Sequence, residues 1–89
     1  MTKYCFDLME RDSSGQFRLI SREYFNDDNK EDLRLVKKHG VEFAVKKWHW
    51  DKDLEEGEYV VTLFREKRKR NGAIKSKKKI DGYRFEVEG

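Results

Sequence analysis

Apolar and polar residues alternate along the first part of the chain, from Lys3 to Phe25, with one break in the middle. The apolar members of this alternation are Tyr4, Phe6, Leu8, Phe17 and Leu19. A period of two is typical of strands that bury one face. The break, Asp12 to Gly15, has the residue types of a tight turn, so this region is predicted to form a β-hairpin.

A helix is predicted to begin near Lys30. Either Asp28 or Asn29 can cap it, with Glu31 or Asp32 three residues further on, which is the spacing of a capping box.

The pattern leaves two possible ends for this helix. In the first, one long helix continues to Trp50. Its buried stripe would consist of Leu33, Val36, Gly40, Val41, Ala44, Val45 and Trp48. In the second, Gly40 ends the helix after a run of basic residues, and the β-branched and aromatic residues of 41–50 form a strand. We expect the long helix and keep the strand as the alternative.

Two further strands complete the pattern. Glu58–Glu66 is apolar on both faces, which is typical of a central strand. Gly82–Glu88 alternates, and its inward residues would be Tyr83, Phe85 and Val87. The predicted fold class is α+β, a small antiparallel sheet of about four or five strands packed against one helix, in the order ββαββ or ββαβββ. The length fits a single domain spanning residues 1–89.

Positive charge is concentrated between the last two predicted strands. Charged residues make up 44% of the chain, whose net charge is only +3. The segment 65–79 holds nine Lys or Arg and one acid, so it carries +8 and leaves −5 on the remainder. The nine are Arg65, Lys67, Arg68, Lys69, Arg70, Lys75, Lys77, Lys78 and Lys79. Asn71-Gly72 favours a type I′ turn, so 65–79 is predicted to be a basic hairpin arm or loop, mobile until an anion relieves the repulsion across it.

Cations along a ribbon can meet successive phosphates, which indicates a non-catalytic protein that binds DNA or RNA, or a nucleoprotein, without sequence preference. The alternative is a protein partner. A small inhibitor or adaptor of the kind found in phages and mobile elements could bind a host or defence protein through an acidic face or an exposed tryptophan. The candidate interface residues are Trp48, Trp50, Asp51, Asp53, Glu55 and Glu56.

Other chemistry finds little support in the sequence. An EF-hand loop starting at Asp51 would put Glu56 where glycine is required and Thr62 where a bidentate glutamate belongs, so we expect no metal site.

Cys5 is the only cysteine and lies in an apolar run, so it is expected to be an inert core thiol in a cytoplasmic protein. We expect no catalytic residues and no cofactor. A small-molecule ligand is not expected, and no apolar run is long enough for a membrane span.

The basic segment resembles one known structural unit. Asn71-Gly72, the cations from Lys75 to Lys79 and the pair Gly82-Tyr83 resemble the basic hairpin and glycine-aromatic pair of the three-stranded arm-binding domains of tyrosine recombinases. That resemblance implies a DNA-contacting sheet. In the family a helix follows the sheet, and this sequence ends at Gly89 without one, so no residue role is transferred.

Overall fold

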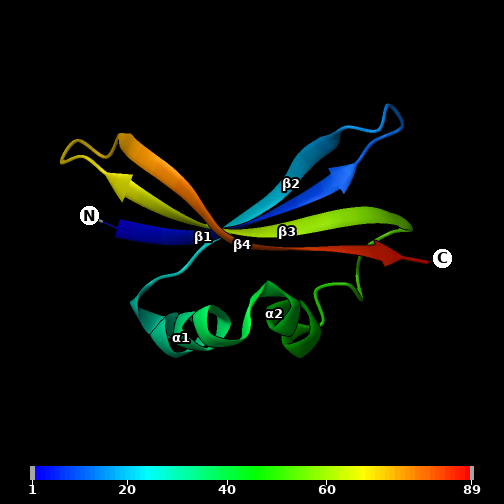
Figure 1. Cartoon of the computed structure of the whole chain (residues 1–89), viewed down its shortest axis with the longest axis horizontal. Coiled ribbons are helices and arrows are strands. Elements are labelled where there is room, and N and C mark those ends of the chain that lie inside the picture. Colours follow the sequence, from blue (N-terminus) through cyan, green and yellow to red (C-terminus); the bar gives the residue numbers. More distant parts are fainter. Residues whose placement is uncertain (1, 89) are drawn as a thin grey trace.

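The computed structural model describes residues 2–88, and of Asp27 the backbone alone (Figure 1). The strands are β1 (Thr2–Arg11), β2 (Phe17–Tyr24), β3 (Gly57–Arg68) and β4 (Ile74–Val87). A 3₁₀ turn, η1 (Asp27–Asn29), leads into the helices α1 (Lys30–His39) and α2 (Val41–Trp48). The strands form one antiparallel sheet in the order β2-β1-β3-β4. The α+β class and the central position of β3 are confirmed, whereas the element order is ββααββ.

The prediction of one helix is wrong, because the chain forms two helices, and 41–50 is not a strand. Gly40 separates them with φ +93° and ψ 170°, a backbone conformation that only glycine adopts readily. Its N–H donates to the carbonyl of Val36 at 2.7 Å and ends α1. The N–H of Val41 then donates to Asp81 Oδ2 at 2.8 Å, so a carboxylate from β4 caps the start of α2. The break therefore depends on a contact distant in sequence.

The start of the helical region also differs in its capping. The capping box is formed by Asn26 and Asn29 around η1, and Asn29 precedes α1 without a side-chain cap. The predicted start at Lys30 is correct.

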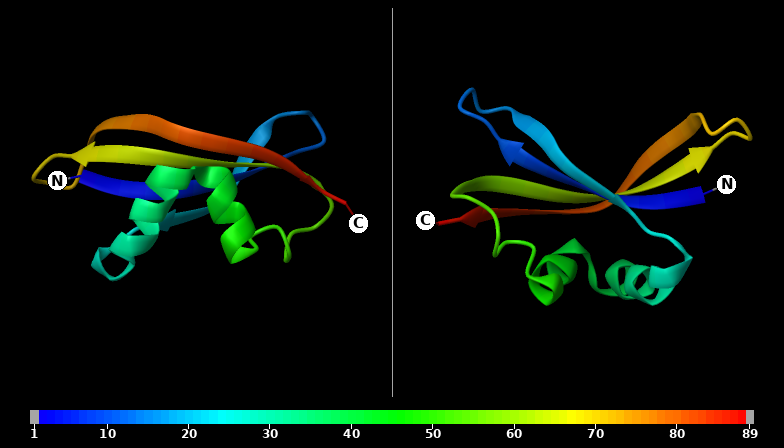
Figure 2. Two further views of the ribbon diagram at one scale, coloured as in Figure 1. Left: turned by 60° about the horizontal axis from the view of Figure 1, so that its bottom comes forward. Right: turned by 180° about the vertical axis from the view of Figure 1, so that it is seen from behind.

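Both helices lie on the same face of the sheet, which we call the helix-side face; the other is the open face (Figures 1 and 2). The core lies between the helices and the two central strands. Its buried members are Phe6, Val36, Val41, Ala44, Val45, Val61 and Leu63. Four residues of the stripe predicted for one long helix are thus buried by two shorter helices, namely Val36, Val41, Ala44 and Val45.

The sheet is strongly twisted, and its two hairpin turns point away from the helices at opposite ends of the molecule, whose longest axis spans 44 Å (Figure 1). The turns have the same geometry. The N–H of Gly15 donates to the carbonyl of Asp12, and the N–H of Gly72 to that of Lys69, each at 3.0 Å. Both glycines have positive φ, 88° and 87°.

The type I′ turn expected at Asn71-Gly72 is therefore absent. That turn needs positive φ at both residues, and Asn71 does not have it. The turn begins earlier, at Lys69, and Asn71 instead accepts a hydrogen bond from the N–H of Ala73 at 3.0 Å.

None of the helices in the described part of the chain is long and apolar enough to span a membrane.

Candidate nucleic-acid interface

Residues 65–79, the cationic arm, run up the end of β3, through the turn and down the start of β4. The pairing of these strands decides which cations are neighbours. Arg65 lies opposite Lys78, and Lys67 lies opposite Ser76. Because residues that face each other across an antiparallel pair have Cβ atoms about 5 Å apart, Arg65 and Lys78 are like charges in close proximity.

The arm continues the helix-side face of the sheet beyond the core. Leu63 is buried under the helices, and alternation places Arg65 and Lys67 on the same face further along β3. Pairing with β1 and β4 then defines two rows across the sheet. The rows are Tyr4, Arg65 and Lys78, followed by Thr2, Lys67 and Ser76. Adjacent rows are two residues apart, or about 7 Å along the strand.

A further cation reaches this face from α1. Lys37 Nζ lies 3.4 Å from the hydroxyl oxygen of Tyr4 and 4.8 Å from the centroid of its ring. Lys37 therefore extends the first row, so α1, β1, β3 and β4 all contribute to it. Sequence reasoning missed Lys37, because it considered the basic run before Gly40 only as a feature of the helix end.

Most of the predicted cations have no counterion in the part of the chain that the structure describes. Within residues 2–88 these side chains form no hydrogen bond or ion pair with another described residue. They are Arg65, Lys67, Lys69, Arg70, Lys75, Lys78 and Lys79. The buried carboxylates of the sheet, Asp7 and Glu66, are bound by Arg22, Lys77 and Arg68 and do not neutralise these seven cations.

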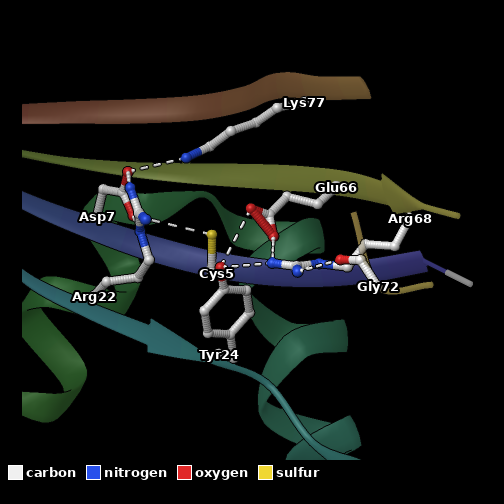
Figure 3. A network of polar contacts seen from close by, with 8 residues as sticks. All are labelled: Cys5, Asp7, Arg22, Tyr24, Glu66, Arg68, Gly72 and Lys77. Carbon is white, nitrogen blue, oxygen red and sulfur yellow. Dashed lines mark hydrogen bonds and ion pairs between the residues drawn. The ribbon is translucent and has the colours of Figure 1, made fainter. Parts of the chain in front are cut away.

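Two of the predicted residues have internal partners on the open face (Figure 3). Lys77 Nζ lies 3.3 Å from Asp7 Oδ2 and 4.3 Å from the centroid of the Phe64 ring. Arg68 donates to Glu66 Oε2 at 2.9 Å, to the Tyr24 hydroxyl at 3.1 Å and to the carbonyl of Gly72 at 2.9 Å. Their role in the structure is to tie the base of the arm to β1 and β2.

The carboxylates of this network are buried. Asp7 is 5% exposed and Glu66 is fully buried. Asp7 accepts two hydrogen bonds from Arg22, at 2.7 and 3.0 Å. Burial alone would raise the pKa of each carboxyl. For Asp7 the hydrogen bond from Arg22 and the charges of Lys77 and Arg22 together outweigh burial. For Glu66 the hydrogen bonds from Arg68 and Tyr24 and the charges of Arg68 and Lys77 together outweigh it, so both pKa values lie below their ordinary range. Both groups stay ionised at neutral pH.

Cys5 lies between these two carboxylates and is fully buried. Its Sγ is 3.9 Å from Asp7 Oδ1, and burial, followed by the charge of Asp7, raises the pKa of the thiol. A protonated, inaccessible thiol is a packing residue rather than a nucleophile.

The other predicted interface residues lie away from the arm. Trp48 and Trp50 are half-buried, with ring centroids 5.4 Å apart. The acids Asp51, Asp53, Glu55 and Glu56 are exposed on the segment between α2 and β3. Since β3 begins at Gly57 and its cations start at Arg65, the acidic segment and the arm stand at opposite ends of one strand, about 30 Å apart. Among residues 2–88 no group of three or more His, Cys, Asp or Glu side chains is placed to hold a metal ion.

Comparisons of this chain with protein families, with curated proteins and with solved structures find no match.

Proposed function

We propose that this protein binds nucleic acid through the cationic arm, and that the contacts are to phosphates rather than to bases. The observation that supports this function is the pair of rows on the helix-side face. There, Arg65 and Lys78 face each other with no acid between them, and Lys37 adds a third charge from α1. Like charges that face each other across a strand pair destabilise the arm. A phosphate backbone bound there would relieve this repulsion, and the release of its counterions would favour binding.

The shape of the arm is compatible with a duplex groove. A two-stranded ribbon, with strands about 4.8 Å apart, fits a major groove about 12 Å wide. Nine of the fifteen residues of the arm are Lys or Arg, and Asn71, which could read a base edge, already accepts a hydrogen bond from the N–H of Ala73. Binding should therefore be insensitive to sequence.

The network on the open face supports the same function indirectly. Arg68 and Lys77 hold the base of the arm against Tyr24 and Asp7, so less chain entropy is lost when the exposed cations meet a ligand. Substitution of Arg68 or Lys77 would disturb the sheet as well as the binding, so neither residue is suitable for the test.

The test compares two variants that each lose three positive charges. The first changes Lys67, Arg70 and Lys78 of the arm to Gln. The control changes Arg18, Lys46 and Lys52, which are exposed and lie outside the arm, to Gln. Binding of mixed-sequence duplex DNA, single-stranded DNA and RNA is measured by fluorescence anisotropy at several salt concentrations.

If about five cations meet duplex phosphates, log K should fall with log salt at a slope of about −4 to −5. The arm variant should flatten this slope by about 3, and the control should leave it near the wild-type value. Absence of binding by the wild-type protein, or equal losses in the two variants, would disprove the proposal.

A further inference from the structure

A second feature lies on the helix-side face, and no residue of the cationic arm lines it. A cavity of about 300 Å³ opens between the end of β2, the start of α1 and the end of α2. A neighbouring hollow of about 220 Å³ lies under β1 and β2, and the two share Phe6, Glu23 and Trp50. The helices leave this part of the sheet uncovered because α2 packs on β3 and β4. No ligand site was expected in a chain of this size.

The walls of the cavity are aromatic. Trp50 meets Phe6 edge-on, with centroids 4.7 Å apart and an interplanar angle of 77°. Phe6 in turn contacts Phe25 at 5.0 Å, and Trp48 lies 5.4 Å from Trp50 at an angle of 30°. Both indoles are half-buried, so each keeps part of its surface toward the opening. Indole faces carry negative electrostatic potential and attract cations.

Two acids complete the lining, Glu23 from β2 and Asp32 from the first turn of α1. In the described part of the chain neither forms a hydrogen bond or an ion pair with another described residue. The three acids that are held in the sheet differ, because Asp7, Glu58 and Glu66 are each bound by an arginine. Carboxylates beside exposed indole faces make a site complementary to a positive charge.

We propose that this cavity binds an arginine side chain presented by a partner protein. The planar guanidinium would stack on an indole and donate to Glu23 or Asp32, while the apolar stem would lie against Phe6 and Phe25. A volume near the lower end of the range for ligand sites fits one side chain better than a larger molecule. A nucleotide is disfavoured, since its phosphates would face two carboxylates. The site is separate from the cationic arm and does not depend on the function proposed for it.

The two tryptophans make this site directly observable. They are the only tryptophans of the chain, so intrinsic emission reports on the cavity alone. The probe is a short blocked peptide with a single arginine among alanines, and its control is the same peptide with citrulline, which has the same shape without the charge. We expect a saturable change in emission with the arginine peptide and binding weaker by about tenfold or more with citrulline.

Charge substitutions in the protein provide a second test of the site. Glu23→Gln with Asp32→Asn should weaken binding of the arginine peptide at least about fivefold. Glu56→Gln with Glu86→Gln, which removes two acids at another place on the surface, should leave it unchanged.

Equal binding of the arginine and citrulline peptides, or no change in emission with either, would overturn the proposal. So would tighter binding of a lysine peptide, which would make the site a general ammonium site. A change in emission that depends on protein concentration and disappears in Arg70→Gln would contradict the proposed partner protein. It would mean that the cavity binds Arg70 from the cationic arm of a second copy of this chain. The comparison of peptides on the wild-type protein remains decisive if the double variant fails to fold.

Discussion

Glu66 has an unusual environment for a carboxylate. It is fully buried in the sheet although no helix covers the open face, and it accepts hydrogen bonds from Arg68 at 2.9 Å and from Tyr24 at 3.2 Å. An ion pair of this kind contributes little compared with well-packed apolar groups, but removal of one partner leaves the other charge without compensation.

Glu66→Ala should therefore lower the free energy of unfolding by about 3 kcal/mol. Equilibrium unfolding in urea measures this change. Glu56→Ala serves as the control, because Glu56 is exposed and forms no contact of this kind, and it should stay within about 0.5 kcal/mol of the wild-type protein. A loss at Glu66 no larger than that of the control would mean that Arg68 finds another partner.

The same carboxylates predict how stability depends on pH. The pKa values of Asp7 and Glu66 lie below their ordinary range in the folded protein, so the unfolded chain takes up protons first as the pH falls. Their contribution to stability is thus fully present above the ordinary carboxyl pKa of about 4 and is lost as the pH falls through the lower, folded values.

Urea unfolding at about pH 7, 5 and 3 should show little change between the first two and a clear loss at the third. Asp7→Asn with Glu66→Gln should be less stable at neutral pH but lose less on acidification. If its stability falls as steeply as that of the wild-type protein, other carboxyls cause the acid sensitivity.

Among the structural elements, the break between α1 and α2 depends most on a single residue. Gly40 has a backbone conformation that side chains disfavour, and a Cβ placed there would lie 3.1 Å from Asp81 Oδ2, the atom that caps α2. Gly40→Ala should cost about 2–3 kcal/mol, because strain and loss of the cap act together.

Gly72→Ala is the matched control. Gly72 also has positive φ, but a Cβ there meets nothing within 4 Å, so only the conformational cost of about 1 kcal/mol applies. Thermal unfolding of the two variants compares them directly. Equal destabilisation would mean that the contact with Asp81 adds nothing to the loss of stability in Gly40→Ala.

The elements that could be predicted are those encoded by local pattern. The first hairpin, the start of α1 at Lys30 and the central position of β3 follow from period and turn chemistry. The pattern predicts a helical conformation for 41–48, but not the break at Gly40 that makes this segment a second helix. Its start is capped by Asp81, forty residues away in sequence, and no local pattern contains that contact.

In the candidate interface too, some features follow from local sequence and others only from the folded sheet. The charge of the segment 65–79 is visible in the sequence, but the register decides which cations are available. A shift of one residue between β3 and β4 would turn Lys77 away from Asp7, and Lys37 joins the rows only because α1 packs near Tyr4. Arg68 reaches Tyr24 of β2 and Lys77 reaches Asp7 of β1, so only the folded sheet distinguishes these two from the other cations.

At the scale of the whole molecule, charge is separated along the longest axis. The arm occupies one end, and the other end has a hollow lined by acids and the last strand residues. The acids of that lining are Glu56, Glu58, Glu86 and Glu88. These acids repel the same polyanion that the arm attracts, over a distance of about 30 Å along β3.

Changing Glu56, Glu86 and Glu88 to Gln should therefore raise the affinity for duplex DNA about threefold at about 0.01 M salt, where the screening length is about 30 Å. At about 0.15 M salt the screening length is about 8 Å, and the variant should bind like the wild-type protein. Anisotropy titrations at the two salt concentrations test this. An increase that persists at the higher salt would place the acidic end in contact with the nucleic acid.

Burial of Cys5 has a practical consequence. It is the only cysteine of the chain and its thiol is inaccessible and protonated, so a maleimide should not label the folded wild-type protein. A cysteine introduced by Asn71→Cys at the tip of the arm, or by Ser13→Cys at the tip of the other hairpin, would then be the one reactive position. Each tip can carry a single fluorophore or nitroxide without removal of the native thiol, and the signals of the two tips can be compared with and without a ligand.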